Sequence, residues 1–345
     1  MSTTQTLCEF LENTGAEVRV YDMGRRVCEI SRDDFVRFEN TDIPYPLPMQ
    51  QKAWFALVQL RTGPADEPLI WFLRFDLDEQ GKLILATRDY FIQRLLELAG
   101  GGADRADLGA ALEDNPFTFK PREDKMANLN ALVNYQLGRT SSQYFNHARD
   151  YFAGELGWDQ WNFVGYQGIA DLAARQAEPQ IGRLLGEAIS QLPSEPLVAL
   201  CQCLENQTIG DALAHALQAR LQQALQEKET APYLLAALLR GLSRAREDIR
   251  QPTVAMTLQH PGAADPEVLA AIGGRAWESL LHTQTLRRYI ECLAGEKVQQ
   301  EVFSHCVADL MRLPGMRETV LKELRAPDRS ERVAQAFQSM LGQDQ

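Results

Sequence analysis

The sequence lacks any long hydrophobic run. Its longest strongly apolar stretches, residues 54–60, 69–75 and 233–239, are far shorter than the roughly 20 residues that cross a bilayer. The first residues carry neither a basic region nor an apolar core, so a secretory signal is not expected. We therefore expect a cytoplasmic protein with no membrane-spanning segment.

The chain also lacks an excess of positive charge. It has 35 Lys and Arg against 47 Asp and Glu, a formal net charge of -12. Residues 1–140 and residues 141–345 each contribute -6, so the sequence has neither a basic arm nor an acidic tail. Nucleic acid and anionic lipid both attract a basic face. The charge therefore argues against nucleic acid and membrane as partners.

Sequence signatures of catalysis and metal binding are missing as well. We find no phosphate-binding GxxxxGK[ST], no GxSxG and no HExxH, and no two of the five His lie three or four residues apart. Among the six Cys, Cys201 and Cys203 are separated by one residue, which is not the spacing of a zinc or redox pair. We expect no catalytic residue, no metal site and no cofactor, and cysteines that remain thiols.

Up to about residue 100 the apolar residues follow strand and short-helix patterns. Strands are expected at residues 17–21, 26–30, 54–60, 69–75 and 82–86, and helices at residues 4–13, 31–40 and 87–98. The connections are too short for parallel crossovers. The sequence thus predicts an α+β domain over residues 1–100, with a mostly antiparallel sheet of about five strands and flanking helices.

Residues 101–140 are expected to join this domain to the rest. They begin within the glycine triplet at residues 100–102, which follows no strand and is typical of a linker. A short helix is expected at residues 103–113, an extended segment at residues 115–121 and a longer helix at residues 124–137.

From residue 141 to the end, only helical patterns occur, and some recur. Pro196, Pro232 and Pro266 each stand in the first turn of an expected helix, 36 and 34 residues apart. A second helix should follow each one, at residues 209–225, 246–259 and 277–294. Two helices every 35–40 residues are typical of an α-solenoid, although irregular all-α packing is the alternative. We predict an all-α helical-repeat domain over residues 141–345.

Three stretches resemble a known family. They are residues 68–83 (PLIWFLRFDLDEQGKL), 115–127 (NPFTFKPREDKMA) and 148–172 (ARDYFAGELGWDQWNFVGYQGIADL). They are similar to an uncharacterised bacterial family, a domain of unknown function that spans nearly the full chain. The resemblance implies a cytoplasmic bacterial protein and assigns no activity or site. The repeats are also similar, more loosely, to HEAT-type helical repeats.

One segment is unusually aromatic. Residues 144–166 contain eight of the 28 aromatic residues of the chain. Tyr and Trp bury a large area at a small entropic cost and are common in binding hot spots. These aromatics could form a core where the two domains dock, or an exposed groove for a partner. For the second case the candidate partner-binding residues are Tyr144, Tyr151, Trp158, Trp161 and Tyr166.

These observations favour a non-catalytic protein-interaction or adaptor protein that uses its helical-repeat surface, because solenoids expose long faces to their partners. The partner expected is another protein of unknown identity. The alternative is an enzyme or small-ligand binder with a site at the junction of the two domains, where pockets commonly form.

Overall fold

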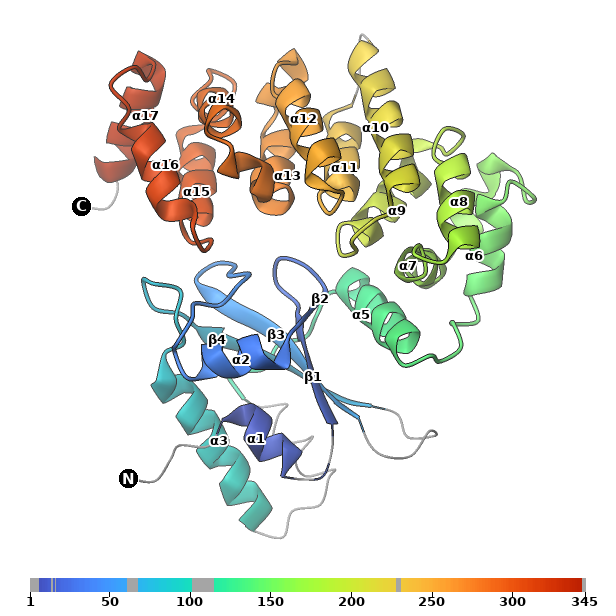
Figure 1. Ribbon diagram of the computed structural model, residues 1–345, viewed down its shortest axis with the longest axis vertical. Helices are drawn as coiled ribbons and strands as arrows, with labels where there is room; N and C mark the ends of the chain where they lie inside the picture. The colour runs from blue at the N-terminus through green and yellow to red at the C-terminus, as the bar shows by residue number, and fades with distance from the viewer. Residues whose placement is uncertain are drawn as a thin grey trace. The chain divides into compact units, whose positions relative to one another are not determined.

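We analysed a computed structural model of the protein (Figure 1). It describes residues 6–60 apart from residues 14 and 16, and residues 68–100, 115–227 and 231–342. The chain divides into two compact units, one formed mainly by Met1–Arg122 and the other by Glu123–Met311 and Gly315–Gln345. The segment expected to join two domains is thus shared between them. The short helix expected at residues 103–113 lies outside the described residues.

The first unit is built on an antiparallel sheet. Its four strands are β1 (Glu17–Asp22), β2 (Cys28–Ile30), β3 (Lys52–Leu60) and β4 (Leu69–Asp76), in the order β2-β1-β3-β4. The register places Ile30, Val20, Leu57 and Trp71 in one row across the sheet. This row and its neighbours two residues along form an apolar face, as the period of two along each strand requires.

Three helices cover that face: α1 (Leu7–Glu12), α2 (Arg32–Glu39) and α3 (Leu85–Gly100). Ring pairs such as Phe35 with Phe55 and Phe75 with Phe91 join helices to strands, with centroids 5.0 and 5.9 Å apart. The result is the α+β architecture predicted from the sequence, with its core between the helices and one face of the sheet.

The fifth strand predicted for residues 82–86 was wrong. Only a single bridge, between Leu77 and Leu83, forms there, and α3 already begins at Leu85. The edge of β4 is paired instead by the extended segment at residues 115–121. The amide of Arg74 donates to the carbonyl of Phe117 (2.7 Å), and the amide of Phe119 donates to the carbonyl of Phe72 (3.2 Å). A covered edge is protected from pairing with other chains.

A buried carboxylate joins two of the covering helices. Glu39, at the end of α2, accepts hydrogen bonds from the amides of Leu7 (2.6 Å) and Cys8 (3.3 Å) at the start of α1. Burial raises the pKa of Glu39 to about 7, although the two amides and Arg88 favour its charged form. The N-terminal helix is therefore attached through a group that titrates near neutral pH.

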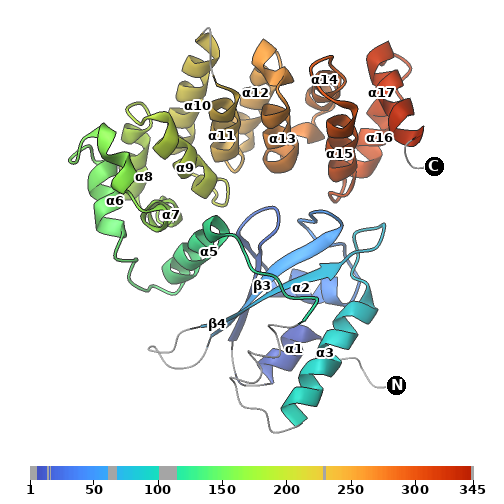
Figure 2. The same ribbon diagram turned by 180° about the vertical axis from the view of Figure 1, so that it is seen from behind.

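The second unit consists of helices in two layers (Figure 2). One layer contains α5 (Glu123–Gln136), α7 (Tyr166–Ala174), α9 (Ser194–Leu204), α11 (Pro232–Leu242), α13 (Pro266–Arg275) and α15 (Gln300–Met311), each in contact with the next. The other contains α6 (Phe145–Phe152), α8 (Pro179–Ala188), α10 (Asp211–Gln226), α12 (Glu247–Thr257), α14 (Thr283–Leu293) and α16 (Met316–Leu324). The last helix, α17 (Glu331–Gly342), packs on α14, α15 and α16.

Polar contacts between neighbouring helix pairs recur at nearly constant spacing. Gln218 donates to Thr253 and Gln251 to Thr285, 35 and 34 residues apart, and Arg246 donates to Asp211 across 35. This spacing agrees within one residue with the 34 residues between Pro232 and Pro266, which begin α11 and α13. The helical region predicted after residue 141 is confirmed, and it begins earlier, at Glu123.

One expected helix is interrupted. Residues 277–294 were predicted to form a single helix, but they form a short 3-10 helix, η3 (Trp277–Leu281), followed by α14. A further 3-10 turn, η2 (Pro261–Ala264), precedes α13. Across the described ranges, no helix is long and apolar enough to cross a bilayer.

Candidate partner-binding surface

The aromatic segment spans α6, a 3-10 helix η1 (Trp158–Phe163) and the start of α7. Two glycines with positive φ, Gly154 (77°) and Gly157 (82°), turn the chain from α6 into η1. Residues other than glycine rarely adopt positive φ angles. A β-carbon at Gly154 would lie 3.1 Å from the ring of Trp158, so the turn also holds that ring against the end of α6.

Two of the predicted binding residues form the base of this segment. Tyr151 is fully buried, its ring meets that of Trp158 edge-on at 5.8 Å, and its hydroxyl donates to the Trp158 carbonyl at 3.0 Å. Trp158 itself is half-buried. Tyr151 therefore supports the segment from inside the second unit and is not available to a partner in this structure.

Tyr144 lies on the surface at the start of α6 and is 48% exposed. Its position is fixed by the close approach of α6 and α7. A β-carbon at Gly168 would lie only 2.5 Å from the Tyr144 carbonyl oxygen, and one at Gly165 would lie 3.3 Å from its ring. Glycine at both positions thus lets α7 pack against the residue that presents the Tyr144 ring.

The most exposed aromatic of the segment is Phe163, which is 72% exposed and is absent from the residues predicted to bind a partner. Trp158 and Trp161, earlier in η1, are both half-buried. Gln160, between them, has non-helical backbone angles, so no regular period runs through η1. A periodic sequence pattern could therefore not have identified Phe163 as the exposed ring.

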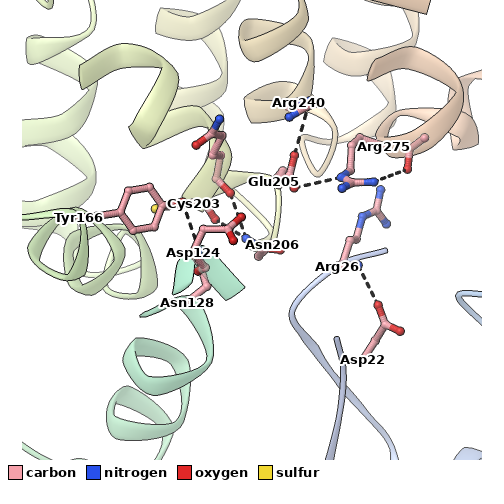
Figure 3. Close-up of polar contacts among 12 residues, drawn as sticks. Asp22, Arg26, Asp124, Asn128, Tyr166, Cys203, Glu205, Asn206, Arg240 and Arg275 are labelled. Carbon is pink, nitrogen blue, oxygen red and sulfur yellow. Dashed lines mark hydrogen bonds and ion pairs between the residues drawn. The ribbon is translucent and has the colours of Figure 1, made fainter. Parts of the chain in front are cut away.

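Tyr166 points away from this surface, into a polar cluster between α5, α7 and α9 (Figure 3). Its hydroxyl accepts a hydrogen bond from the amide of Asn128 at 3.5 Å and faces the Cys203 thiol. Burial raises the pKa of Tyr166 well above its ordinary value and that of Cys203 to about 12. Both groups stay neutral at physiological pH, and the cluster serves to join three helices.

We define the aromatic patch as Tyr144 and Phe163 together with the half-buried Trp158 and Trp161. A β-carbon at Gly165 would lie 3.3 Å from the Tyr144 ring, and Phe163 stands two residues before Gly165, so the two exposed side chains come from neighbouring parts of the backbone. Of the residues predicted to bind a partner, Tyr144 is exposed and Trp158 and Trp161 are half-buried. Tyr151 contacts Trp158 but is fully buried, and Tyr166 faces the polar cluster, so neither is included in the patch.

Charged groups elsewhere in the second unit are used to join repeats. Glu205 follows the last turn of α9, where the helix dipole disfavours a carboxylate. It contacts Arg275 at 2.9 Å and Arg240 at 4.0 Å (Figure 3). These three residues are spaced 35 apart, one at the end of each successive helix of the layer. The contacts are those of a structural ion pair that spans three repeats.

Other residues with catalytic potential have structural partners too. Arg287 binds Glu323 (3.0 Å) and Asp328 (2.8 Å), and His282 contacts Glu247 at 2.7 Å, each pair joining neighbouring repeats. All six cysteines are thiols, and burial raises the pKa of Cys201, Cys292 and Cys306 as well as that of Cys203. Raised thiol pKa values disfavour the nucleophilic thiolate. No group of three or more His, Cys, Asp or Glu in the described residues could hold a metal ion.

An α+β unit combined with a layered helical array defines an architecture and no particular reaction. Within that architecture, the chain belongs to the family described as "Protein of unknown function (DUF3549)", whose model matches residues 2–341. The match covers both units and confirms the resemblance to a domain of unknown function over nearly the full chain. No curated protein and no solved structure matches this chain.

Proposed function

We propose that this protein is a non-catalytic protein-interaction adaptor and that the aromatic patch on its helical-repeat unit holds a partner protein. One observation carries the proposal: two large aromatic side chains, Tyr144 and Phe163, are 48% and 72% exposed on a surface whose base is rigidly packed. Covering a Phe side chain contributes about 1.5–3 kcal/mol. Rigid, exposed aromatics are therefore suited to anchor a partner.

The type of partner follows from the charge. A net charge of -12 repels nucleic acid, so a protein is the better candidate. The helical array supports this choice because stacked repeats present an extended surface without needing a catalytic cavity. We further propose that the protein acts in the bacterial cytoplasm, which the resemblance noted in the sequence implies.

Affinity capture with matched variants tests this function. The full chain is immobilised and exposed to lysate of the source organism, as wild type, as Tyr144→Ser/Phe163→Ser and as the control Tyr233→Ser/Leu341→Ser. The control removes one Tyr and one other large hydrophobic side chain that are 44% and 54% exposed on distant helices. Circular dichroism and thermal melts confirm that all three proteins fold alike.

We expect a specific protein to be captured by the wild type and the control, and to be reduced about tenfold or more by the patch variant. If all three proteins capture the same set, the patch is not the binding surface. If the wild type captures nothing above an empty support, the adaptor function itself is contradicted.

A further inference from the structure

We propose that the element bound by the aromatic patch is a basic segment of the partner, carrying Arg or Lys beside apolar anchor residues. This inference rests on the proposed function and adds the chemistry of the partner. It is drawn from three exposed acidic side chains, in the aromatic segment and on α9, and from the exposed rings of the patch.

Three exposed acidic side chains, two in the aromatic segment and one on α9, which packs against α7, have no opposing charge within ion-pair distance among the described residues. Glu155 lies in the turn before η1, Asp159 lies in η1 itself, and Glu195 lies in the first turn of α9; all three are exposed. None of them forms an ion pair within 4.0 Å in the described parts of the chain, although the Asp159 carboxylate accepts a hydrogen bond from Gln160. Their charge is therefore available to a partner.

Two arginines close to the aromatic segment along the chain have other contacts. Arg149 binds the neighbouring carboxylate of Asp150, with nitrogen–oxygen distances of 2.9 and 3.1 Å. Arg175 is buried, with its guanidinium 5.6 Å from the ring centre of Tyr135 and 5.5 Å from that of Phe145. Neither Arg149, which is paired with Asp150, nor Arg175, which is buried, therefore pairs with the three carboxylates.

Two of the acidic groups lie close enough to Tyr151, beneath Trp158, to affect its ionisation. The charges of Asp159 and Glu195 both contribute to raising the pKa of Tyr151, after the larger effect of burial. Asp159 belongs to η1 and Glu195 to α9, so negative charge from two separate elements acts on Tyr151. A cation held over the patch would meet at least these two carboxylates.

The rings favour the same partner. The face of an exposed Tyr or Phe ring attracts a guanidinium or ammonium group within about 6 Å of its centre, for about 0.5–1 kcal/mol at exposed sites. Apolar residues of the same segment would cover the rest of the Phe163 ring. An acidic segment would place like charges opposite each other, and so would a second copy of this chain docked patch to patch.

Binding of two defined peptides to the full chain tests the inference. The probes are fluorescein-labelled 16-residue amphipathic peptides, one built from Arg and Leu and the other from Glu and Leu in the same order. The protein variants are Phe163→Ser and the triple variant Glu155→Gln/Asp159→Asn/Glu195→Gln. The control is Glu301→Gln/Glu318→Gln/Glu331→Gln, which removes three exposed acids from α15, α16 and α17 and changes the net charge by the same amount.

We expect the Arg–Leu peptide to bind the wild type in fluorescence polarisation. The patch triple variant and Phe163→Ser should each weaken binding about tenfold, and the control triple variant less than twofold, with an affinity that falls as salt rises. If the two triple variants weaken binding equally, the attraction is a property of net charge, and the inference is overturned. If the Glu–Leu peptide binds better, it is overturned as well.

These outcomes are separable from those of the proposed function. Capture of a native partner that depends on Tyr144 and Phe163, combined with no Phe163-dependent binding of the basic peptide, would contradict the basic segment and leave the adaptor function intact. Loss of both would contradict the patch itself.

Discussion

The packing of α6 on α7 gives a sharp test of how the patch is held, through two glycine substitutions with opposite expected signs. Gly168→Ala would place a β-carbon 2.5 Å from the Tyr144 carbonyl oxygen and 2.8 Å from the Ala148 β-carbon. Neither atom can move without shifting α6, so we expect a loss of about 3 kcal/mol. At Gly186, inside α8, an added β-carbon meets nothing within 4 Å. Gly186→Ala should therefore stabilise the helix by about 1 kcal/mol.

Differential scanning calorimetry of the full chain measures both effects. For a unit of this size, 1 kcal/mol corresponds to about 2–4 °C in the melting temperature, so Gly168→Ala should lower it by about 6–12 °C and Gly186→Ala should raise it by about 2–4 °C. If Gly168→Ala melts like the wild type, α6 and α7 do not approach this closely. In that case the position of Tyr144 would not be set by close packing of α6 on α7.

Three further predictions concern buried or paired charges. The pKa of Glu39 is about 7 in the folded protein, above its ordinary value of 4.5. Protonation of Glu39 should therefore increase the free energy of unfolding by about 3 kcal/mol as the pH falls from about 7 to 4.5. Urea unfolding of the wild type should show this pH dependence, and Glu39→Gln should lack it. Glu205→Gln and Arg275→Gln should show about 1 kcal/mol of coupling in a double-mutant cycle, and additive effects would contradict the ion pair. Arg175→Lys should cost about 1 kcal/mol in the same urea assay, because the guanidinium lies over two rings and donates to two carbonyls, and unchanged stability would argue against these contacts.

The architecture was predictable where local signals were strong. Strands β1, β3 and β4 follow from alternating or branched residues, and the prolines at positions 232 and 266 begin α11 and α13 as the sequence indicates. The strand predicted at residues 82–86 failed because its apolar residues, Leu83 and Leu85 among them, suit a helix start as well as a strand. Tertiary packing, in this case the pairing of β4 with residues 115–121, decided which element completes the sheet.

The candidate surface was predictable in position and less so in composition. A local excess of aromatics located the segment, but exposure depends on turns that the sequence pattern does not specify. Gly154 and Gly157 redirect the chain out of α6 into η1, which is itself interrupted by non-helical angles at Gln160, and Phe163 at its end is exposed. Tyr151 is buried against Trp158, seven residues later, through a contact that forms across the turn between α6 and η1 and not along one helix.

Site-specific photo-crosslinking in living cells tests the central claim most directly. A photoreactive phenylalanine derivative in place of Phe163 should, on irradiation, join the full chain to one partner protein, and the same derivative at Leu341 should not. A discrete crosslinked product from position 163 alone is the result that the proposed adaptor function predicts. Equal labelling from both positions, or none from position 163, would contradict it.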